Sequence, residues 1–166
     1  MRVAILTISD RSSRGERSDE GGPLIAQIIG ETLKWDCSLT KIIPDDLDQI
    51  RNTLIEWCDS NRADLVLTTG GTGFAPRDIT PEATRSVIER EVPGIPEALR
   101  AASLKITQHA MLSRAVAGIR KKTLIINLPG NPKAVRENLE VLIPILPHAL
   151  GLLKGEAQTE REHRTV

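Results

Sequence analysis

The strongest constraint on the fold is a regular alternation of short apolar runs with helical patterns. Four runs typical of buried strands cover residues 3–8, 38–43, 63–69 and 123–128. Between them, apolar residues recur at the spacing of amphipathic helices, as they do from Leu47 to Asp59. Strands that alternate with helices predict a mainly parallel sheet covered by helices on both faces, which is an α/β fold.

Prolines mark several expected helix boundaries. Three helix starts are predicted, at Pro23, at Thr80–Pro81 as N-cap and first helical residue, and at Asn131–Pro132. A further helix is expected over about residues 95–106, with Ile106 on its apolar face, and a short strand around 115–119. The polar, glycine-rich residues 10–22 are expected to form a loop. Pro144 and Pro147 predict a kink in the last helix.

Length and composition favour one domain over residues 1–154, followed by a polar tail over 155–166. Of the 166 residues, 40 % are hydrophobic and 2 % aromatic, so aliphatic side chains must form the core. A net charge of zero argues against a dedicated nucleic-acid binder. Cys37, in an apparent loop, and Cys58, on a helix stripe, are too few for a disulfide framework, which favours the cytoplasm. No run approaches a membrane span.

Polar residues follow the expected strands where each one ends. They are Ser9 and Asp10 after the first strand, Asp45 and Asp46 after the second, Thr69, Gly70, Gly71, Thr72, Gly73 and Asp78 after the third, and Pro129, Gly130, Asn131 and Pro132 after the last. Because ligands of open α/β sheets bind beyond the carboxyl ends of parallel strands, these groups are expected to meet at one edge.

The glycine loop TTGGTGFAPRD predicts a phosphate ligand. Glycines let a ligand approach the main chain, and their N–H groups can face an anion. The helix that follows adds a positive N-terminus. The loop lacks the Gly-Lys-Ser/Thr ending of a Walker A motif and does not match the dinucleotide fingerprint. A plain tight turn between strand and helix is the alternative.

Asp45 and Asp78 sharpen the phosphate prediction. Two carboxylates beside a phosphate site would repel the ligand unless a cation lies between, and Mg²⁺ typically takes one or two carboxylates plus phosphate oxygens. The alternative for Asp45 is a helix N-cap, and for Asp78 a turn residue or a partner of Arg77. Asp10 has the same ambiguity, and Asp46 is interpreted as the solvated member of its pair.

The sequence does not indicate covalent catalysis by a nucleophilic side chain. No H-E-x-x-H, G-x-S-x-G or cysteine–histidine signature occurs. The expected site is therefore one that positions phosphates, and phosphoryl-type transfer suits such a site because positioning and charge neutralisation do most of the work.

Three stretches resemble the molybdopterin adenylyltransferases, which are the bacterial Mog proteins and the G domain of gephyrin. They are ILTISDRSSRG, LTTGGTGFAPRDITPEAT and AMLSRAVAGIRKKTLIINLPGNPKAV. The similarity runs from Val3 to about Leu153. It implies a three-layer α/β/α sandwich, a homotrimer, and the transfer of AMP from Mg-ATP to the terminal phosphate of molybdopterin with release of pyrophosphate.

The resemblance also implies roles for individual residues. Asp45 and Asp78 match the activity-critical aspartates of the family and are expected to be catalytic and to hold Mg²⁺. Residues 69–73 match the nucleotide-phosphate loop, and Ser9, Asp10, Ser113, Pro129, Gly130, Asn131 and Pro132 match pocket positions that bind ATP or the pterin. Ordinary caps are the alternatives for Ser113 and Asn131. Two rival functions stay open: a non-catalytic molybdopterin-binding or scaffold protein that acts with a molybdenum insertase, and a relative that binds molybdopterin or a nucleotide but catalyses another reaction.

Overall fold

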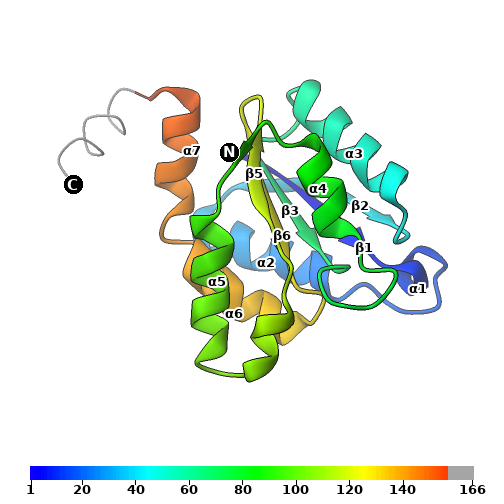
Figure 1. Cartoon of the computed structure of the whole chain (residues 1–166). Coiled ribbons are helices and arrows are strands. Elements are labelled where there is room, and N and C mark those ends of the chain that lie inside the picture. Colours follow the sequence, from blue (N-terminus) through cyan, green and yellow to red (C-terminus); the bar gives the residue numbers. More distant parts are fainter. Residues whose placement is uncertain (157–166) are drawn as a thin grey trace.

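A six-stranded sheet forms the centre of the computed structural model, which describes residues 1–156 (Figure 1). The strands are β1 (Arg2–Ile8), β2 (Asp36–Ile43), β3 (Leu65–Thr69), β4 (Arg90–Glu91), β5 (Ala117–Arg120) and β6 (Thr123–Leu128). They lie in the order β2-β1-β3-β6-β5-β4. Strands β2, β1, β3 and β6 pair in parallel, whereas β5 is antiparallel to both of its neighbours. The predicted mainly parallel sheet is confirmed.

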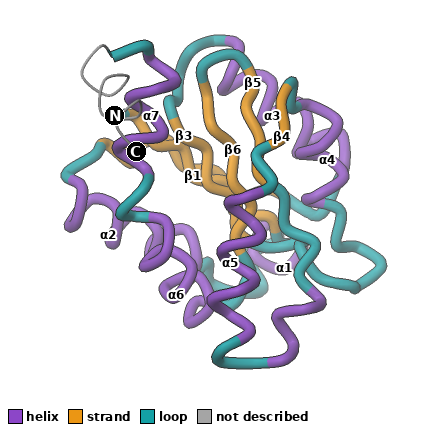
Figure 2. Tube along the Cα trace, turned by 60° about the vertical axis from the view of Figure 1, so that its left-hand side comes forward, coloured by secondary structure: helices purple, strands orange, loops and turns teal. Residues whose placement is uncertain are grey.

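Helices cover both faces of this sheet (Figures 1 and 2). They are α1 (Asp10–Ser13), α2 (Gly21–Leu33), α3 (Leu47–Asp59), α4 (Thr80–Val87), α5 (Gly94–Leu104), the 3₁₀ helix η1 (Gln108–Leu112), α6 (Pro132–Leu142) and α7 (Leu146–Lys154). One hydrophobic cluster joins the sheet to α2, α5, α6 and α7, and a second joins it to α3 and α4. The three-layer α/β/α sandwich is confirmed.

The central strand β3 shows how the sequence builds both clusters at once. Its side chains alternate between the two faces of the sheet, because successive residues of a strand point in opposite directions. Leu65 and Leu67 belong to the cluster of α2 and α6, while Val66 belongs to that of α3. A strand buried on both faces therefore reads as a continuous apolar run.

Two expected boundaries around the first helices are wrong. Residues 10–22, predicted as a loop, contain α1 and the beginning of α2. Helix α2 begins at Gly21, before Pro23, because the Asp19 carboxylate accepts hydrogen bonds from the N–H groups of Gly21 and Gly22 at 3.1 Å each. Asp19 thus satisfies N–H groups that a helix start leaves free.

Elsewhere the predictions hold to different degrees. Asn131 caps α6 as expected, and Cys58 is buried. Cys37 lies in β2 and not in a loop. Thr80 is the first residue of α4, and Ile79 takes the N-cap position. Ile106, expected on a buried helix face, follows the end of α5 and is 56 % exposed.

The C-terminal segment is divided where its prolines predicted a kink. Pro144 falls between α6 and α7, which are separate helices. Gly155, at a φ of 70°, follows the end of α7. Most of the expected tail, residues 157–166, lies outside the described residues. None of the helices formed by residues 1–156 has the length and apolar character needed to cross a membrane.

Candidate functional site

The parallel strands bring the predicted polar segments to one edge of the sheet. Strand β3 lies between β1 and β6, with Thr69 opposite both Thr7 and Leu128. The loops that follow β1, β3 and β6 therefore leave the sheet side by side. The hydroxyl of Thr69 donates to the carbonyl of Pro129 at 2.8 Å, which ties the glycine loop to the turn after β6.

The glycine loop, residues 70–73, has a conformation that only glycine adopts easily. Gly70 and Gly71 have φ values of 101° and 63°. A Cβ atom on Gly70 would lie 2.2 Å from the carbonyl oxygen of Ile8, and one on Gly71 would lie 2.4 Å from the hydroxyl of Thr80. Gly130 packs against Gly70 less closely, since its Cβ would lie 3.3 Å from the Gly70 Cα.

All four carbonyl groups of the glycine loop are anchored to the protein. The Gly70 carbonyl accepts from the Thr80 hydroxyl at 2.9 Å, and the Gly71 carbonyl accepts from the Thr80 N–H at 3.1 Å. The Thr72 carbonyl accepts from the main-chain N–H of Arg114 at 2.9 Å. The Gly73 carbonyl accepts from Nε of the same arginine at 2.7 Å.

These anchors determine where the N–H groups of the loop point. In a trans peptide the C=O and the following N–H point in opposite directions, and the described chain has no cis peptide bond. The N–H groups of Gly71, Thr72, Gly73 and Phe74 therefore point away from Thr80 and Arg114. Within residues 1–156 none of these four donates to a protein acceptor. The Gly70 N–H differs, because it donates to the Leu128 carbonyl at 3.3 Å.

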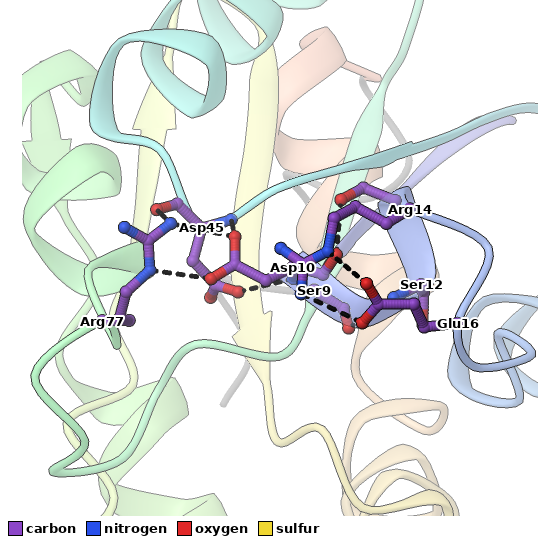
Figure 3. Close-up of polar contacts among 8 residues, drawn as sticks. Ser9, Asp10, Ser12, Arg14, Glu16, Asp45 and Arg77 are labelled. Atoms are coloured by element: carbon purple, nitrogen blue, oxygen red, sulfur yellow. Dashed lines mark hydrogen bonds and ion pairs between the residues drawn. The ribbon is translucent and has the colours of Figure 1, made fainter.

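Asp10 and Asp45 hold each other through the main chain (Figure 3). The Asp10 N–H donates to the Asp45 carboxylate at 2.9 Å, and the Asp45 N–H donates to the Asp10 carboxylate at 3.1 Å. The guanidinium of Arg77 donates two hydrogen bonds, of 2.7 and 2.9 Å, to the carboxylate of Asp10. It also donates to the main-chain carbonyl of Asp45 at 2.8 Å. The side chain of Asp45 thus has no cationic partner of its own within the described chain.

The two carboxylates have opposite pKa shifts. The hydrogen bonds from Arg77 lower the pKa of Asp10. Burial raises the pKa of Asp45, and the negative charges of Asp10 and Asp78 raise it further. A carboxylate that is costly to ionise, with a second carboxylate close enough to be felt, is a place where a bound cation would be stabilising.

The alternatives for the aspartates are now decided. Asp46, and not Asp45, caps α3 by accepting from the Gln49 N–H at 2.9 Å. Asp78 is a turn residue whose carboxylate accepts from the Ala75 N–H at 3.0 Å. Arg77 pairs with Asp10 and not with Asp78. The turn role of Asp78 does not remove it from the site, because its carboxylate lies beside Gly73, 2.9 Å from where a Cβ would be.

Two cavities lie on either side of the glycine loop. The first, here called the acidic cavity, has a volume of about 440 Å³. Of the predicted site residues it is lined by Ser9, Asp10, Asp45, Gly71, Asp78, Gly130, Asn131 and Pro132, and Arg11 and Arg17 also face it. Seven of these eight residues are polar or glycine, so the lining of the cavity is mainly carboxylate, hydroxyl and amide groups, with Ile8 and Pro132 as its apolar members.

The second cavity, here called the side cavity, has a volume of about 530 Å³ and lies among α5, η1 and α6. Of the predicted site residues it is lined by Thr72, Gly73, Ser113, Pro129 and Asn131. Arg100 and Lys133 face the same space and bring positive charge. Asn131 lines both cavities while its side chain caps α6. Thr69 and Gly70 instead line a small third cavity of about 120 Å³ beside α2.

The donor set of the acidic cavity fits Mg²⁺ that is shared with a phosphate ligand. Within residues 1–156 no group of three or more acidic, histidine or cysteine side chains is arranged to hold a metal ion. Asp45 and Asp78 supply two carboxylates, and unpartnered N–H groups lie next to them. Because Mg²⁺ is usually bound by one or two carboxylates together with phosphate oxygens and water, these residues fit the ion.

Three residues of the site were not predicted as such from the sequence. Arg77 holds Asp10, Thr80 anchors two carbonyls of the glycine loop, and Arg114 anchors two more. The sequence predicts Arg77 only as a possible ion-pair partner of Asp78, and Thr80 only as a helix cap. Nothing in the sequence around Arg114 signals its role, because the contact spans 41 residues.

Comparison with known proteins identifies relatives over most of the chain. The sequence model of a family described as a probable molybdopterin binding domain matches residues 4–148. The chain is 46 % identical over 156 residues to the molybdopterin adenylyltransferase of Helicobacter pylori (strain J99), covering 93 % of this chain and 89 % of that protein.

Two further matches bear on the range of functions in the family. The chain is 46 % identical over 174 residues to gephyrin of Dictyostelium discoideum, with 98 % of this chain covered, but it spans only 24 % of gephyrin. The crystal structure of the molybdopterin biosynthesis enzyme MoaB from Thermus thermophilus has a TM-score of 0.87 and 48 % identity, with 93 % of this chain and 97 % of that chain covered. The predicted resemblance is confirmed: the chain belongs to the molybdopterin-binding domain family of molybdenum cofactor biosynthesis, together with molybdopterin adenylyltransferases and gephyrin.

Proposed function

We propose that the protein is a molybdopterin adenylyltransferase, which transfers AMP from ATP to the terminal phosphate of molybdopterin. The observation that best supports this is the set of unpartnered N–H groups at Gly71, Thr72, Gly73 and Phe74. The carboxylates of Asp45 and Asp78 lie beside Gly71 and Gly73 of this set. Main-chain N–H groups of this kind bind phosphate oxygens. The similarity to the Helicobacter pylori adenylyltransferase over nearly its whole length supports the same reaction.

In this proposal each cavity takes one substrate. The acidic cavity takes the triphosphate of ATP, which extends to the N–H groups of the glycine loop from Gly71 onward, while Asp45 and Asp78 would hold Mg²⁺. When bound, Mg²⁺ neutralises charge on the phosphates and on the leaving pyrophosphate. The side cavity takes molybdopterin, with Arg100 and Lys133 near its phosphate, although Arg100 also donates to the Ala115 carbonyl and Lys133 also pairs with Glu137. Arg77 keeps Asp10, and through it Asp45, in position.

The reaction is an in-line displacement at the α-phosphorus. An oxygen of the molybdopterin phosphate forms a bond to that phosphorus while the bond to the bridging oxygen breaks, and pyrophosphate leaves with the electron pair. The attacking phosphate is already ionised near neutral pH, so no protein base is required. Holding both phosphates in line between the cavities lowers the barrier, because a bimolecular step becomes effectively unimolecular.

The remaining parts of this proposal rest on the family resemblance. The protein is proposed to act in the cytoplasm as a homotrimer and to pass its product to a molybdenum insertase. The two described cysteines are both free, which agrees with a reducing compartment.

A second candidate is a non-catalytic molybdopterin-binding or scaffold protein on the same fold. It is favoured by the family description, which names binding of molybdopterin and no reaction. It predicts that the protein binds molybdopterin without consuming ATP.

The deciding experiment is to incubate the purified protein with molybdopterin, ATP and Mg²⁺ and to measure adenylylated pterin and pyrophosphate. We expect both products, and we expect Asp45→Ala and Asp78→Ala to abolish them while the variants stay folded. Asp46→Ala is the matched control, since Asp46 is adjacent and acidic but caps α3. Binding of molybdopterin without formation of either product would establish the second candidate instead.

A further inference from the structure

Arg114 contacts the glycine loop through both its main chain and its side chain. Its N–H donates to the Thr72 carbonyl at 2.9 Å, and its Nε donates to the Gly73 carbonyl at 2.7 Å. One terminal nitrogen of the guanidinium donates to the Asp78 carbonyl, and the other pairs with the Glu82 carboxylate. A single residue therefore meets both ends of the segment 73–78.

The segment between those two ends is held otherwise by the turn hydrogen bonds between Ala75 and Asp78 and by those of Arg77 to Asp10 and Asp45. Phe74, Ala75, Pro76 and Arg77 are all exposed. The side chain of Arg114 is partly buried, with 32 % of it exposed, and lines a cavity together with Phe74, Ala75 and Pro76. Because a guanidinium presents several donors in a rigid planar fork, it can fix two carbonyl groups and one carboxylate at once.

The contacts of Arg114 set the direction of two specific N–H groups. The Thr72 carbonyl belongs to the same peptide as the Gly73 N–H, and the Gly73 carbonyl to the same peptide as the Phe74 N–H. Since both peptides are trans, pulling the carbonyls toward Arg114 turns these N–H groups away from it. Thr80 does the same for Gly71 and Thr72. The directions of the Gly73 and Phe74 N–H groups are thus set by an arginine that lies on the carbonyl side of the loop.

We propose that Arg114 is a positioning residue that holds the glycine loop in the conformation that binds a polyanion. It acts through the carbonyls of Thr72, Gly73 and Asp78 and does not itself contact the ligand. This inference rests on the proposed function only in taking a polyphosphate as the ligand of the loop.

Arg120 provides a matched control within the same chain. It also donates to a main-chain carbonyl, that of Val87, at 2.9 Å, and it also pairs with a carboxylate, that of Asp59, at 2.7 Å. It lines neither the acidic cavity nor the side cavity. Its loss removes a similar set of hydrogen bonds without touching the glycine loop.

The test compares Arg114→Lys, Arg114→Met and Arg120→Met with the unmodified protein. Affinity for inorganic pyrophosphate with Mg²⁺ is measured by calorimetry, and thermal unfolding is measured on the same samples. We expect Arg114→Met to weaken pyrophosphate binding about 10- to 100-fold, because hydrogen bonds to a charged group are worth about a factor of ten or more each. Arg114→Lys keeps the charge but loses the fork, so we expect a loss of about tenfold. Arg120→Met should lower the unfolding temperature and leave the affinity within about twofold.

A second readout follows the loop directly. Amide hydrogen exchange at residues 71–74 should be faster in Arg114→Lys than in the unmodified protein, and unchanged in Arg120→Met. Arg114→Lys is expected to fold even if Arg114→Met does not, so the inference stays testable with the lysine variant alone.

Several outcomes would overturn the inference. One is an Arg114→Lys protein whose pyrophosphate affinity matches that of the unmodified protein, because charge alone would then account for the effect. Another is an equal loss of affinity in Arg120→Met, which would show general destabilisation. Failure of the unmodified protein to bind pyrophosphate would also overturn it. A protein whose pyrophosphate binding depends on Arg114 as expected, but which makes no adenylylated pterin, would support this inference and refute the proposed reaction.

Discussion

The two ends of the parallel sheet each hold an aspartate near an arginine, but the charges are matched at only one of them. At the amino ends of the strands, Asp64 accepts from the N–H of Arg2 at 2.7 Å and from its guanidinium at 2.9 Å, and Lys154 lies 3.3 Å away. At the carboxyl ends, Arg77 binds the carboxylate of Asp10 and only the carbonyl of Asp45.

The pKa values express the same difference. Burial would raise the pKa of Asp64, yet the hydrogen bonds from Arg2 and Lys154 outweigh it and hold the value at about 2. Burial and neighbouring negative charge raise the pKa of Asp45, and they outweigh the hydrogen bond from the Asp10 N–H and the charge of Arg77, which lower it. One end of the sheet uses its charges to stabilise the fold, whereas the other leaves negative charge and N–H groups for ligands. The contrast separates a structural carboxylate from a functional one.

Replacing Asp45 by Asn should have the largest effect, and on activity only. We expect turnover in the adenylylation assay to fall by about 100-fold or more, because an electrostatic contribution to the reaction is lost. The unfolding temperature should stay the same or rise. Since the pKa of Asp45 is raised in the folded protein, its ionised form destabilises the fold above that pKa, and Asn removes this penalty at neutral pH. A drop of several degrees, or unimpaired turnover, would contradict this prediction.

Replacing Asp64 by Asn should do the reverse. Its folded pKa of about 2 lies below its ordinary value of 3.8, so the ionised carboxylate stabilises the fold above about pH 4, and this stabilisation is lost as the pH falls toward 2. We expect the free energy of unfolding at pH 7 to fall by about 2 kcal/mol, from urea titrations, with turnover unchanged. The difference from the unmodified protein should vanish near pH 2, and a difference independent of pH would count against the assignment.

Replacing Thr80 by Val tests the hydrogen bond that anchors the glycine loop at the carboxyl ends of the strands. Valine keeps the volume but removes the hydroxyl that donates to the Gly70 carbonyl, leaving a buried acceptor unpaired. We expect a loss of about 1–2 kcal/mol in unfolding free energy, together with weaker pyrophosphate binding. Thr80→Ser keeps the hydroxyl and serves as the control. If serine and valine behave alike, the hydroxyl does not anchor the loop.

Replacing Lys154 by Met should have the smallest effect. Its ion pair with Asp64 has a lysine side chain that is 35 % exposed, and partly exposed pairs contribute about 1 kcal/mol or less. We expect the pKa of Asp64 to rise slightly in a carbon-detected NMR titration while the contacts from Arg2 remain. An unchanged pKa would assign the whole shift to Arg2.

The sequence was sufficient for the four parallel strands and most helices, because the signals there are local, but not for the short edge strand β4. The apolar run of β6 and the helical spacing of α3 appear directly in neighbouring residues, and α3 begins and ends at the predicted residues. The parallel topology then brings Asp10, Asp45 and the glycine loop to one edge. The start of α2 was missed because it depends on the side chain of Asp19, which substitutes for a standard cap.

The internal supports of the site could not be predicted for a different reason. Arg114 and Thr80 act on carbonyl groups, and a main-chain carbonyl leaves no trace in residue identity. Arg77 pairs with Asp10, which is 67 residues away in the sequence, and not with Asp78, which is its neighbour in the sequence. Patterns in a sequence can indicate which residues gather at a site, whereas the choice among partners within reach is made by the folded geometry.

The register of the three central strands has a consequence for how the protein matures. Val3, Leu65 and Leu124 are brought side by side from distant parts of the chain, and the last of these strands comes late in the sequence. A nascent or truncated chain that ends before β6 lacks Asn131 and also lacks the turn of Pro129 and Gly130 that packs against the glycine loop. Contacts of such long range form slowly, so ligand binding should arise in one late, cooperative step. Recovery of pyrophosphate binding during refolding would then report completion of the whole molecule.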